Sequence, residues 1–439
     1  MVKKNLYKIL LGGSLLFLIL ALVWIATGRI EGSGPFLIAF FLCLTVGVRG
    51  VDALRSFSYT LAIFTAVAAS LFYPACFTSV GSFRLSLLIV PLLQIIMFGM
   101  GSQMSLSDFT GVFRMPRGVL IGVGCQFTIM PLTALAISKI FSFPPEIAAG
   151  IILIGCAPSG LASNVMCYIA HANLPLSVTI GAVATLLAPF LTPLLMKILA
   201  GQFIEVNFWN MMLDILNMII LPIVAGFIFN MFYNRKEKAK SIVIQLSVYF
   251  AIILATNLIY FTSDQPQTAV FLATWAQSFG CFFLLPILGA WGLRKVLGGD
   301  RKVIESFLSF LSMAGIAVII TVITAAGRDS LLEVGALLLV TSVIHNVLGY
   351  TLGYNVARLC KMSEKDRRTV ALEVGMQNGG LASGLAMQMG KIATVGLAPA
   401  VFGPLMNITG SVLASWWRGK LPPEEGAAER ETGVCRERK

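Results

Sequence analysis

Long apolar runs recur along almost the whole chain, and this constrains the fold more than any other feature. A helix needs about 20 mostly apolar residues to cross a bilayer. The chain has 439 residues, 57% hydrophobic and 12% charged, whereas soluble proteins carry about 25% charged residues. We therefore expect an all-α integral membrane protein. About fourteen spans are predicted, at residues 8–27, 35–51, 57–74, 85–104, 117–141, 146–170, 175–200, 207–233, 241–262, 267–293, 303–326, 331–357, 369–391 and 393–417.

Basic residues are concentrated in alternate loops between these spans. Clusters at 235–240, 294–302 and 361–368 fall on one side of the predicted bundle, and the loops on the other side carry few cations. The positive-inside rule places the basic side and both termini in the cytoplasm. We expect a multi-pass protein of the inner or plasma membrane. The net charge of +12 then reflects orientation in the lipid bilayer, and no nucleic-acid partner is expected.

The span at 369–391 has a polar middle. Glu373, Gln377 and Asn378 precede the pair Gly379-Gly380. A carboxylate at the bilayer centre costs about 2.5–3.5 kcal/mol, and each glycine in a helix costs about 1 kcal/mol relative to alanine. A chain tolerates such residues where they face protein or a water-filled cavity. We interpret this span as a helix broken at the glycine pair, whose broken ends hold an ion or a solute.

A second span, 146–170, has a similar break at Pro158-Ser159-Gly160. The sequence Gly-Leu-Ala-Ser occurs at 160–163 and again at 380–383. The predicted topology runs these two spans in opposite directions. Two interrupted helices of opposite direction in corresponding positions are typical of an inverted repeat. We therefore predict two discontinuous helices that cross near the middle of the membrane.

Oxygen-bearing side chains gather around both breaks. Ser163, Asn164 and Ser177 lie near the first, and Glu373 and Gln377 near the second, four residues apart on one helical face. Hard cations such as sodium prefer oxygen ligands, and one carboxylate among neutral oxygens balances a monovalent charge. Hydrogen bonding between helices is the alternative role for the neutral side chains.

Three further polar residues lie within predicted spans. Gln126 is a candidate ligand or a packing amide. His345 and Asn346 are candidates to line a substrate cavity, and His345 is also suited to a structural hydrogen bond. Walker, H-E-x-x-H and G-x-S-x-G motifs do not occur in the sequence, which disfavours ATP-driven transport and familiar hydrolase chemistry.

Several motifs together resemble the bile acid:sodium symporter family. They are Glu-Val-Gly-Met-Gln-Asn at 373–378, Phe-Gly-Met-Gly at 98–101, Gln-Phe-x-x-Met-Pro at 126–131, Ala-Ser-Asn at 162–164 and Leu-Ser-Val at 176–178. The resemblance covers about 57–234 and 299–417. It implies ten helices in two inverted five-helix repeats, arranged as a panel domain and a core domain. It also implies symport of an organic anion with sodium by alternating access.

On this resemblance the chain divides into four parts. Two extra helices at 1–56 precede a first repeat at 57–200. The second repeat, 207–417, contains an inserted two-helix segment at about 235–298, and a disordered cytoplasmic tail follows at 418–439. Packing against the panel domain and a homodimer contact are the two roles open to the extra helices.

The resemblance implies two sodium sites. The first would use Ser163, Asn164, Ser177 and Glu373, and the second Gln126, Gln377, Glu373 and the carbonyl groups of Val374 and Met376. The family often has another hydroxyl four residues after Ser177, where this chain has Gly181; Thr179 and Thr185 are nearby hydroxyls that would have to replace it. For the organic anion the candidates are Asn378 and Ser159, with His345 and Asn346.

We therefore expect a sodium-coupled symporter of a small organic anion and no enzyme activity. Two alternatives stay open from the residues. The same fold would serve a proton-coupled transporter, through Glu373, or an uncoupled one. A membrane-embedded enzyme or sensor is the third class, although the sequence shows no second catalytic carboxylate or metal set beside Glu373.

Overall fold

The computed structural model describes residues 2–51, 57–104, 111–234, 246–247, 250–251, 254–255 and 277–420. These residues are almost entirely helical, with one two-stranded hairpin, β1 (Ser79–Val80) and β2 (Phe83–Arg84). Ten of the described helices are long and apolar enough to cross a membrane, which confirms the all-α membrane class. The predicted span at 241–262 and the tail from 421 lie mostly or wholly outside the described residues, so the count of fourteen stays a prediction.

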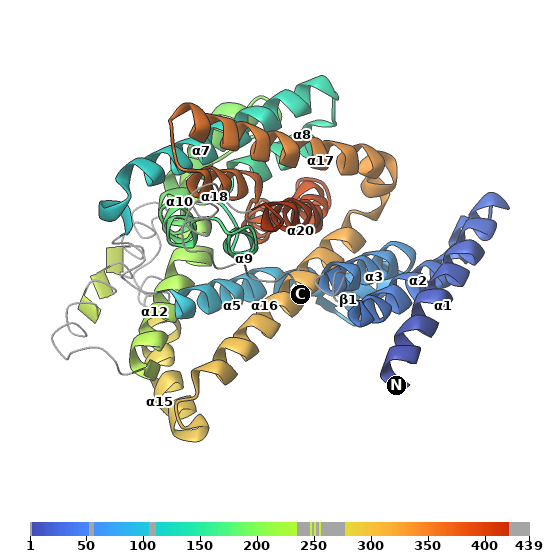
Figure 1. Ribbon diagram of the computed structural model, residues 1–439, viewed down its shortest axis with the longest axis horizontal. Coiled ribbons are helices and arrows are strands. Elements are labelled where there is room, and N and C mark those ends of the chain that lie inside the picture. Colours follow the sequence, from blue (N-terminus) through green and yellow to red (C-terminus); the bar gives the residue numbers. More distant parts are fainter. Residues whose placement is uncertain are drawn as a thin grey trace, which may run out of the picture.

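Four helices form one layer of the bundle, which we call the panel. It crosses the lower half of Figure 1 and comprises α3 (Ser58–Phe72), α5 (Ile89–Gln103), α12 (Leu221–Asn234) and α16 (Arg301–Ala326). Helices α5 and α12 approach closely because glycines face each partner. A Cβ at Gly101 would lie 2.2 Å from the Ile223 carbonyl oxygen, and one at Gly226 would lie 2.3 Å from that of Phe98.

Eight helices form a second group, which we call the core and which fills the upper half of Figure 1. It comprises α7 (Pro116–Ile140), α8 (Pro145–Cys156), α9 (Ala162–Ile169), α10 (Leu174–Leu195), α17 (Arg328–Leu359), α18 (Glu364–Gly375), α19 (Gly379–Gln388) and α20 (Leu397–Arg418). The largest buried apolar cluster joins α5, α12 and α16 of the panel to α8, α19 and α20 of the core.

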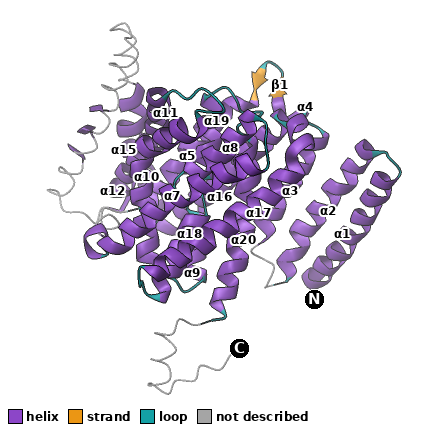
Figure 2. Cartoon of the chain, turned by 90° about the horizontal axis from the view of Figure 1, so that it is seen from above, coloured by secondary structure: helices purple, strands orange, loops and turns teal. Residues whose placement is uncertain are grey.

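The remaining elements lie around these two groups. Helices α1 (Val2–Ala26) and α2 (Gly34–Gly47) form a hairpin at one edge, where α2 packs against α3 (Figure 2). Helix α15 (Leu285–Leu297) packs against α12. The shorter elements are η1 (Ile30–Ser33), η2 (Val48–Gly50), α4 (Ala75–Thr78), η4 (Leu85–Leu88), η5 (Met196–Ala200), α11 (Phe208–Ile215), η6 (Leu216–Ile220) and η7 (Gly280–Leu284).

Two membrane helices are interrupted, as the sequence predicts. The first break separates α8 from α9 at residues 157–161, on the predicted Pro158-Ser159-Gly160. The second separates α18 from α19 at residues 376–378, just before the predicted Gly379-Gly380. The glycine pair therefore opens the second half-helix instead of forming the break. The Asn378 side chain caps this helix by accepting a hydrogen bond from the Leu381 amide at 3.0 Å, which lets the helix start at Gly379.

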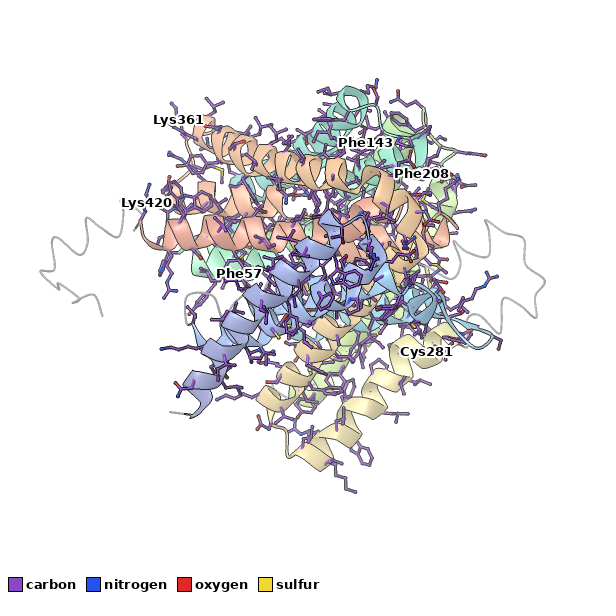
Figure 3. The ribbon with its side chains drawn as sticks, turned by 90° about the vertical axis from the view of Figure 1, so that its right-hand side faces the viewer. Phe57, Phe143, Phe208, Cys281, Lys361 and Lys420 are labelled. Carbon is purple, nitrogen blue, oxygen red and sulfur yellow. The ribbon has the colours of Figure 1, made fainter. Side chains whose placement is uncertain are left out.

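The two ends of the bundle agree with the predicted alternation of loops. Phe57, Lys361 and Lys420 lie at one end of the molecule, and Phe143, Phe208 and Cys281 lie at the opposite end (Figure 3). The predicted topology assigns Phe57, Lys361 and Lys420 to one membrane face and Phe143 and Phe208 to the other, whereas Cys281 lies within the predicted span 267–293. Which of the two ends faces the cytoplasm stays a prediction from the basic loops.

Candidate ion and substrate site

The two broken segments cross each other and pair like strands. Ser159 and Gln377 form an isolated antiparallel bridge. The Gly160 amide donates to the Met376 carbonyl at 3.0 Å, and the Asn378 amide donates to the Pro158 carbonyl at 2.8 Å. Each break therefore satisfies backbone groups of the other, which is what an interruption inside a membrane requires.

A buried carboxylate lies next to this crossing. Glu373, on the last turns of α18, is fully buried. The Ser177 hydroxyl lies 2.5 Å from its Oε1 atom and 2.7 Å from Asn164 Oδ1, and the Ser159 hydroxyl donates to Glu373 Oε2 at 2.6 Å. With Ser163, the residues Ser159 and Asn164 line a cavity of about 30 Å³, which we call the small cavity. The structure thus gathers the predicted first set of sodium ligands.

Most of the predicted second set gathers around Gln377, just after the end of α18. Gln126 Nε2 donates to Gln377 Oε1 at 2.6 Å and to the Ala157 carbonyl at 2.9 Å, and Gln377 Nε2 donates to the Val374 carbonyl at 2.7 Å. Gln126 Oε1 is buried and has no hydrogen-bond partner among the described residues. A buried acceptor without a donor is costly, so this oxygen is available to a cation. The Met376 carbonyl instead accepts the Gly160 amide within the crossing.

A larger cavity of about 130 Å³ lies between the core and the panel, and we call it the large cavity. Its panel wall is apolar and comes from Ile63 on α3, Ile96 and Met97 on α5, and Ile316, Ile319 and Ile320 on α16. Its core wall carries four polar side chains, Gln377, Asn378, Ser383 and Asn407. An apolar cavity with a few convergent polar groups is the usual form of a small-molecule site.

The predicted substrate residues separate into three groups. Asn378 lines the large cavity, as expected. The Ser159 side chain lines the small cavity instead. His345 and Asn346 line neither cavity and are fully buried within the core.

The last two residues bond inside the core. His345 Nε2 lies 3.1 Å from the Met130 carbonyl, and Asn346 Nδ2 donates to Thr409 Oγ1 at 3.2 Å. They face α7 and α20 and not the panel, which agrees with the structural hydrogen bond considered for His345. Position within a span does not tell which neighbour a helix face meets, so the sequence alone did not separate these roles.

Two polar residues of the large cavity were not among the sequence candidates. Asn407 is an isolated amide in the predicted span 393–417, and the same reasoning that singled out Gln126 applies to it. Ser383 closes the second Gly-Leu-Ala-Ser motif. Both line the large cavity, so an isolated polar residue within an apolar run is a signal that can point to this cavity.

Two helix N-termini also meet the large cavity. Helix α9 begins at Ala162 and helix α19 at Gly379, and both residues line it. The N-terminus of a helix carries free amide groups and a partial positive charge of roughly half a unit. Two electropositive helix ends therefore border the large cavity, which favours an anion there. The buried carboxylate of Glu373 contacts residues that line the small cavity, which favours a cation there.

Known proteins match this chain over most of its length. A model of the sodium bile acid symporter family matches residues 90–265. An uncharacterized sodium-dependent transporter of Bacillus subtilis, YocS, is 32% identical over 376 residues, which cover 85% of this chain and 94% of that protein.

More distant relatives come from plants and animals. The probable sodium/metabolite cotransporter BASS1 of Arabidopsis thaliana is 28% identical over 76% of this chain and 67% of its own length. The human ileal sodium/bile acid cotransporter is 27% identical over 70% of this chain and 71% of its own length. These relatives are transporters, so the enzyme considered from the sequence is set aside. This chain belongs to the sodium bile acid symporter family.

Proposed function

We propose that this protein is a secondary active transporter that moves a small organic anion together with sodium by alternating access. One observation carries the proposal. A buried carboxylate surrounded by neutral oxygens lies on one side of the helix crossing, and a cavity with two helix N-termini lies on the other. The relatives named as sodium-dependent transporters support the choice of sodium.

Sodium would bind at two places beside Glu373. The first site uses Ser163, Asn164 and Ser177 with the carboxylate. A serine hydroxyl that donates to a carboxylate keeps lone pairs for a cation, so the hydrogen bonds observed here are compatible with ligation. The second site uses the carboxylate and the oxygens of the following side chains and carbonyls: Gln126, Gln377, Val374 and Met376. The unpartnered Gln126 Oε1 supports it.

Charge balance explains why transport of sodium and of the organic anion would be coupled. Two sodium ions beside a single carboxylate leave one positive charge in a low-dielectric region, where charges interact strongly. An organic anion in the large cavity offsets that charge. Because Gln377 and Asn378 connect the crossing to the large cavity, sodium binding would also order the wall that the anion contacts.

The chemistry of the large cavity limits the substrate to a class. Its lining is mostly apolar, with amide and hydroxyl side chains and no Lys or Arg. A small carboxylate with an apolar body fits this environment, since the helix ends and amides bind the carboxylate and the panel isoleucines contact the body. Bile-acid-like molecules and smaller organic acids belong to this class.

Transport by reconstituted protein tests the proposal. Organic anions are first screened for those that raise the thermal unfolding temperature more with sodium than with choline. Uptake of a radiolabelled hit is then measured in liposomes with an inward sodium gradient, and again with choline replacing sodium. We expect uptake only with sodium. Equal uptake in choline would reject sodium coupling, and uptake driven by a pH gradient without sodium would favour the proton-coupled alternative.

A further inference from the structure

The predicted role of Ser159 in substrate binding does not explain the contact that its side chain makes with Glu373. The Ser159 side chain extends from the first break to the carboxylate of Glu373, so that Ser177 contacts Oε1 and Ser159 contacts Oε2. Ser159 is 6% exposed and lines the small cavity. Ser177 and Ser159 therefore contact different oxygens of the carboxylate and come from different elements of the core, and Ser163 also hydrogen-bonds Glu373.

Gly181 leaves open space beside the same carboxylate oxygen. It lies one turn after Ser177 on α10. A Cβ built at Gly181 would have two atoms within 4 Å, Ser159 Oγ at 3.5 Å and Glu373 Oε2 at 3.6 Å. Both contacts are ordinary van der Waals distances, so a side chain fits there. Because α10 carries no side chain at this point, the oxygen beside Oε2 comes from Ser159.

The hydroxyls of the neighbouring threonines of α10 bond to their own helix, although Thr185 also lines the small cavity. Thr185 donates its hydroxyl proton to the Gly181 carbonyl at 2.7 Å, and Thr179 donates to the Pro175 carbonyl at 2.8 Å. These are bonds to the preceding turn of the same helix, a common arrangement for threonine in membrane helices. The hydroxyl that contacts Glu373 Oε2 is that of Ser159.

We propose that Ser159 is a sodium ligand, and that it supplies from the helix crossing the oxygen that Gly181 does not supply from α10. The proposal rests on the proposed sodium coupling. It also places the ligand on the segment that separates the two cavities. Gly160, the next residue, lines both of them, and Ser159 itself is paired with Gln377. An ion held by Ser159 would thus be bonded to the residue that precedes Gly160 in the wall of the substrate cavity.

Removing the hydroxyl group from position 159 and adding one at position 181 tests whether Ser159 is a sodium ligand. The purified full-length protein is titrated with sodium at constant ionic strength, with choline as the replacement, and the thermal unfolding temperature is recorded. We expect Ser159→Ala to raise the apparent Kd for sodium about tenfold or more, the size usual when a buried charged group loses one partner. Adding Gly181→Ser to this variant should bring the Kd back to within about threefold of the wild type. Ser70→Ala is the control, since the buried Ser70 hydroxyl bonds only its own helix α3 at the Val67 carbonyl.

Each outcome has one meaning. A wild-type protein that sodium does not stabilise would refute the proposed function, and the ligand assignment with it. A wild type that responds to sodium, with an unchanged Kd in Ser159→Ala, would overturn the ligand assignment alone. So would a weakened Ser159→Ala that Gly181→Ser does not repair, provided that both variants unfold near the wild-type temperature without sodium. Ser159→Gly serves as a second truncation if Ser159→Ala is poorly folded.

Discussion

At the scale of single residues, the proposed sodium coupling depends on one carboxylate placed beside a helix crossing. Glu373 is fully buried and hydrogen-bonds the side chains of Ser159, Ser163 and Ser177. Burying an unpaired charge costs several kcal/mol, and neutral hydroxyls offset only part of that cost. A sodium ion would supply the missing positive charge, so the same burial that destabilises the carboxylate alone would make the site bind a cation.

Glu373→Gln should therefore weaken sodium binding by about 100-fold or more, because it keeps the shape of the side chain and removes its charge. The sodium titration described above measures the change. Glu146→Gln is the matched control: Glu146 is paired with Lys391 at the far end of α8, where both side chains are 37% exposed. A sodium response that survives in Glu373→Gln would contradict the role given to this carboxylate.

Asn407→Leu should weaken binding of the anion without changing binding of sodium. Asn407 lines the large cavity and is not among the residues that line the small one. Loss of a hydrogen bond to a charged ligand should raise the apparent KM for the anion about tenfold, while the Kd for sodium measured without the anion stays unchanged. Uptake kinetics and the sodium titration are compared in the same preparation. A parallel rise of both constants would show that Asn407 acts on the fold instead of on the substrate.

At the scale of the elements, the half-helices depend on how their first turns are capped. Asn378 occupies the N-cap of α19 and also lines the large cavity. One residue therefore starts a helix and contributes to the substrate site. The broken helix is stable in this position because the Asn378 side chain accepts from the Leu381 amide, and the amide of Asn378 itself donates to the Pro158 carbonyl of the opposite break.

Asn378→Ala should lower the free energy of unfolding by about 1 kcal/mol, the usual cost of a lost N-cap, and should also weaken anion binding. Asn207→Ala is the comparison, because Asn207 caps α11 in the same way at 3.1 Å and lies outside both cavities. Thermal unfolding and anion binding are measured for both variants. Equal anion binding in the two would mean that Asn378 serves the helix alone.

The sequence predicted these elements better than it predicted side-chain directions. Spans follow from apolar length, and both breaks follow from polar residues and proline or glycine within a span. The second break lies slightly earlier than Gly379-Gly380 because the Asn378 cap decides where α19 begins. The sequence predicts a substrate role for Ser159 and, as one of two roles, for His345, because a position in a span does not reveal which neighbour its side chain meets. That information comes from the packing of helices far apart in the sequence.

At the scale of the whole molecule, the proposed alternating access requires the core to move against the panel. The two groups touch where α19 packs on α5: a Cβ at Gly384 would lie 2.5 Å from Leu93 Cδ2. A glycine at this contact lets the helices approach closely. Because packed helices have discrete arrangements, we infer that this contact must separate during alternating access.

A disulfide across this contact tests the inference. Leu93→Cys and Gly384→Cys are combined in a protein in which serine replaces Cys76 and Cys281, the exposed cysteines among the described residues, and also Cys435, which lies outside them. We expect oxidation to reduce sodium-driven uptake to background and a reductant to restore it. The two single-cysteine variants, treated with the same oxidant, provide the control. Full uptake by cross-linked protein would show that the core and panel move together at this point.

Gly160 lines both cavities. The bound ion and the bound solute would therefore lie on either side of the same backbone segment. Their mutual dependence then needs no relay of side chains through the protein. Substitutions in outlying helices such as α1 and α2 should alter how fast the cycle turns, while the ratio of ions to solute carried per cycle stays the same.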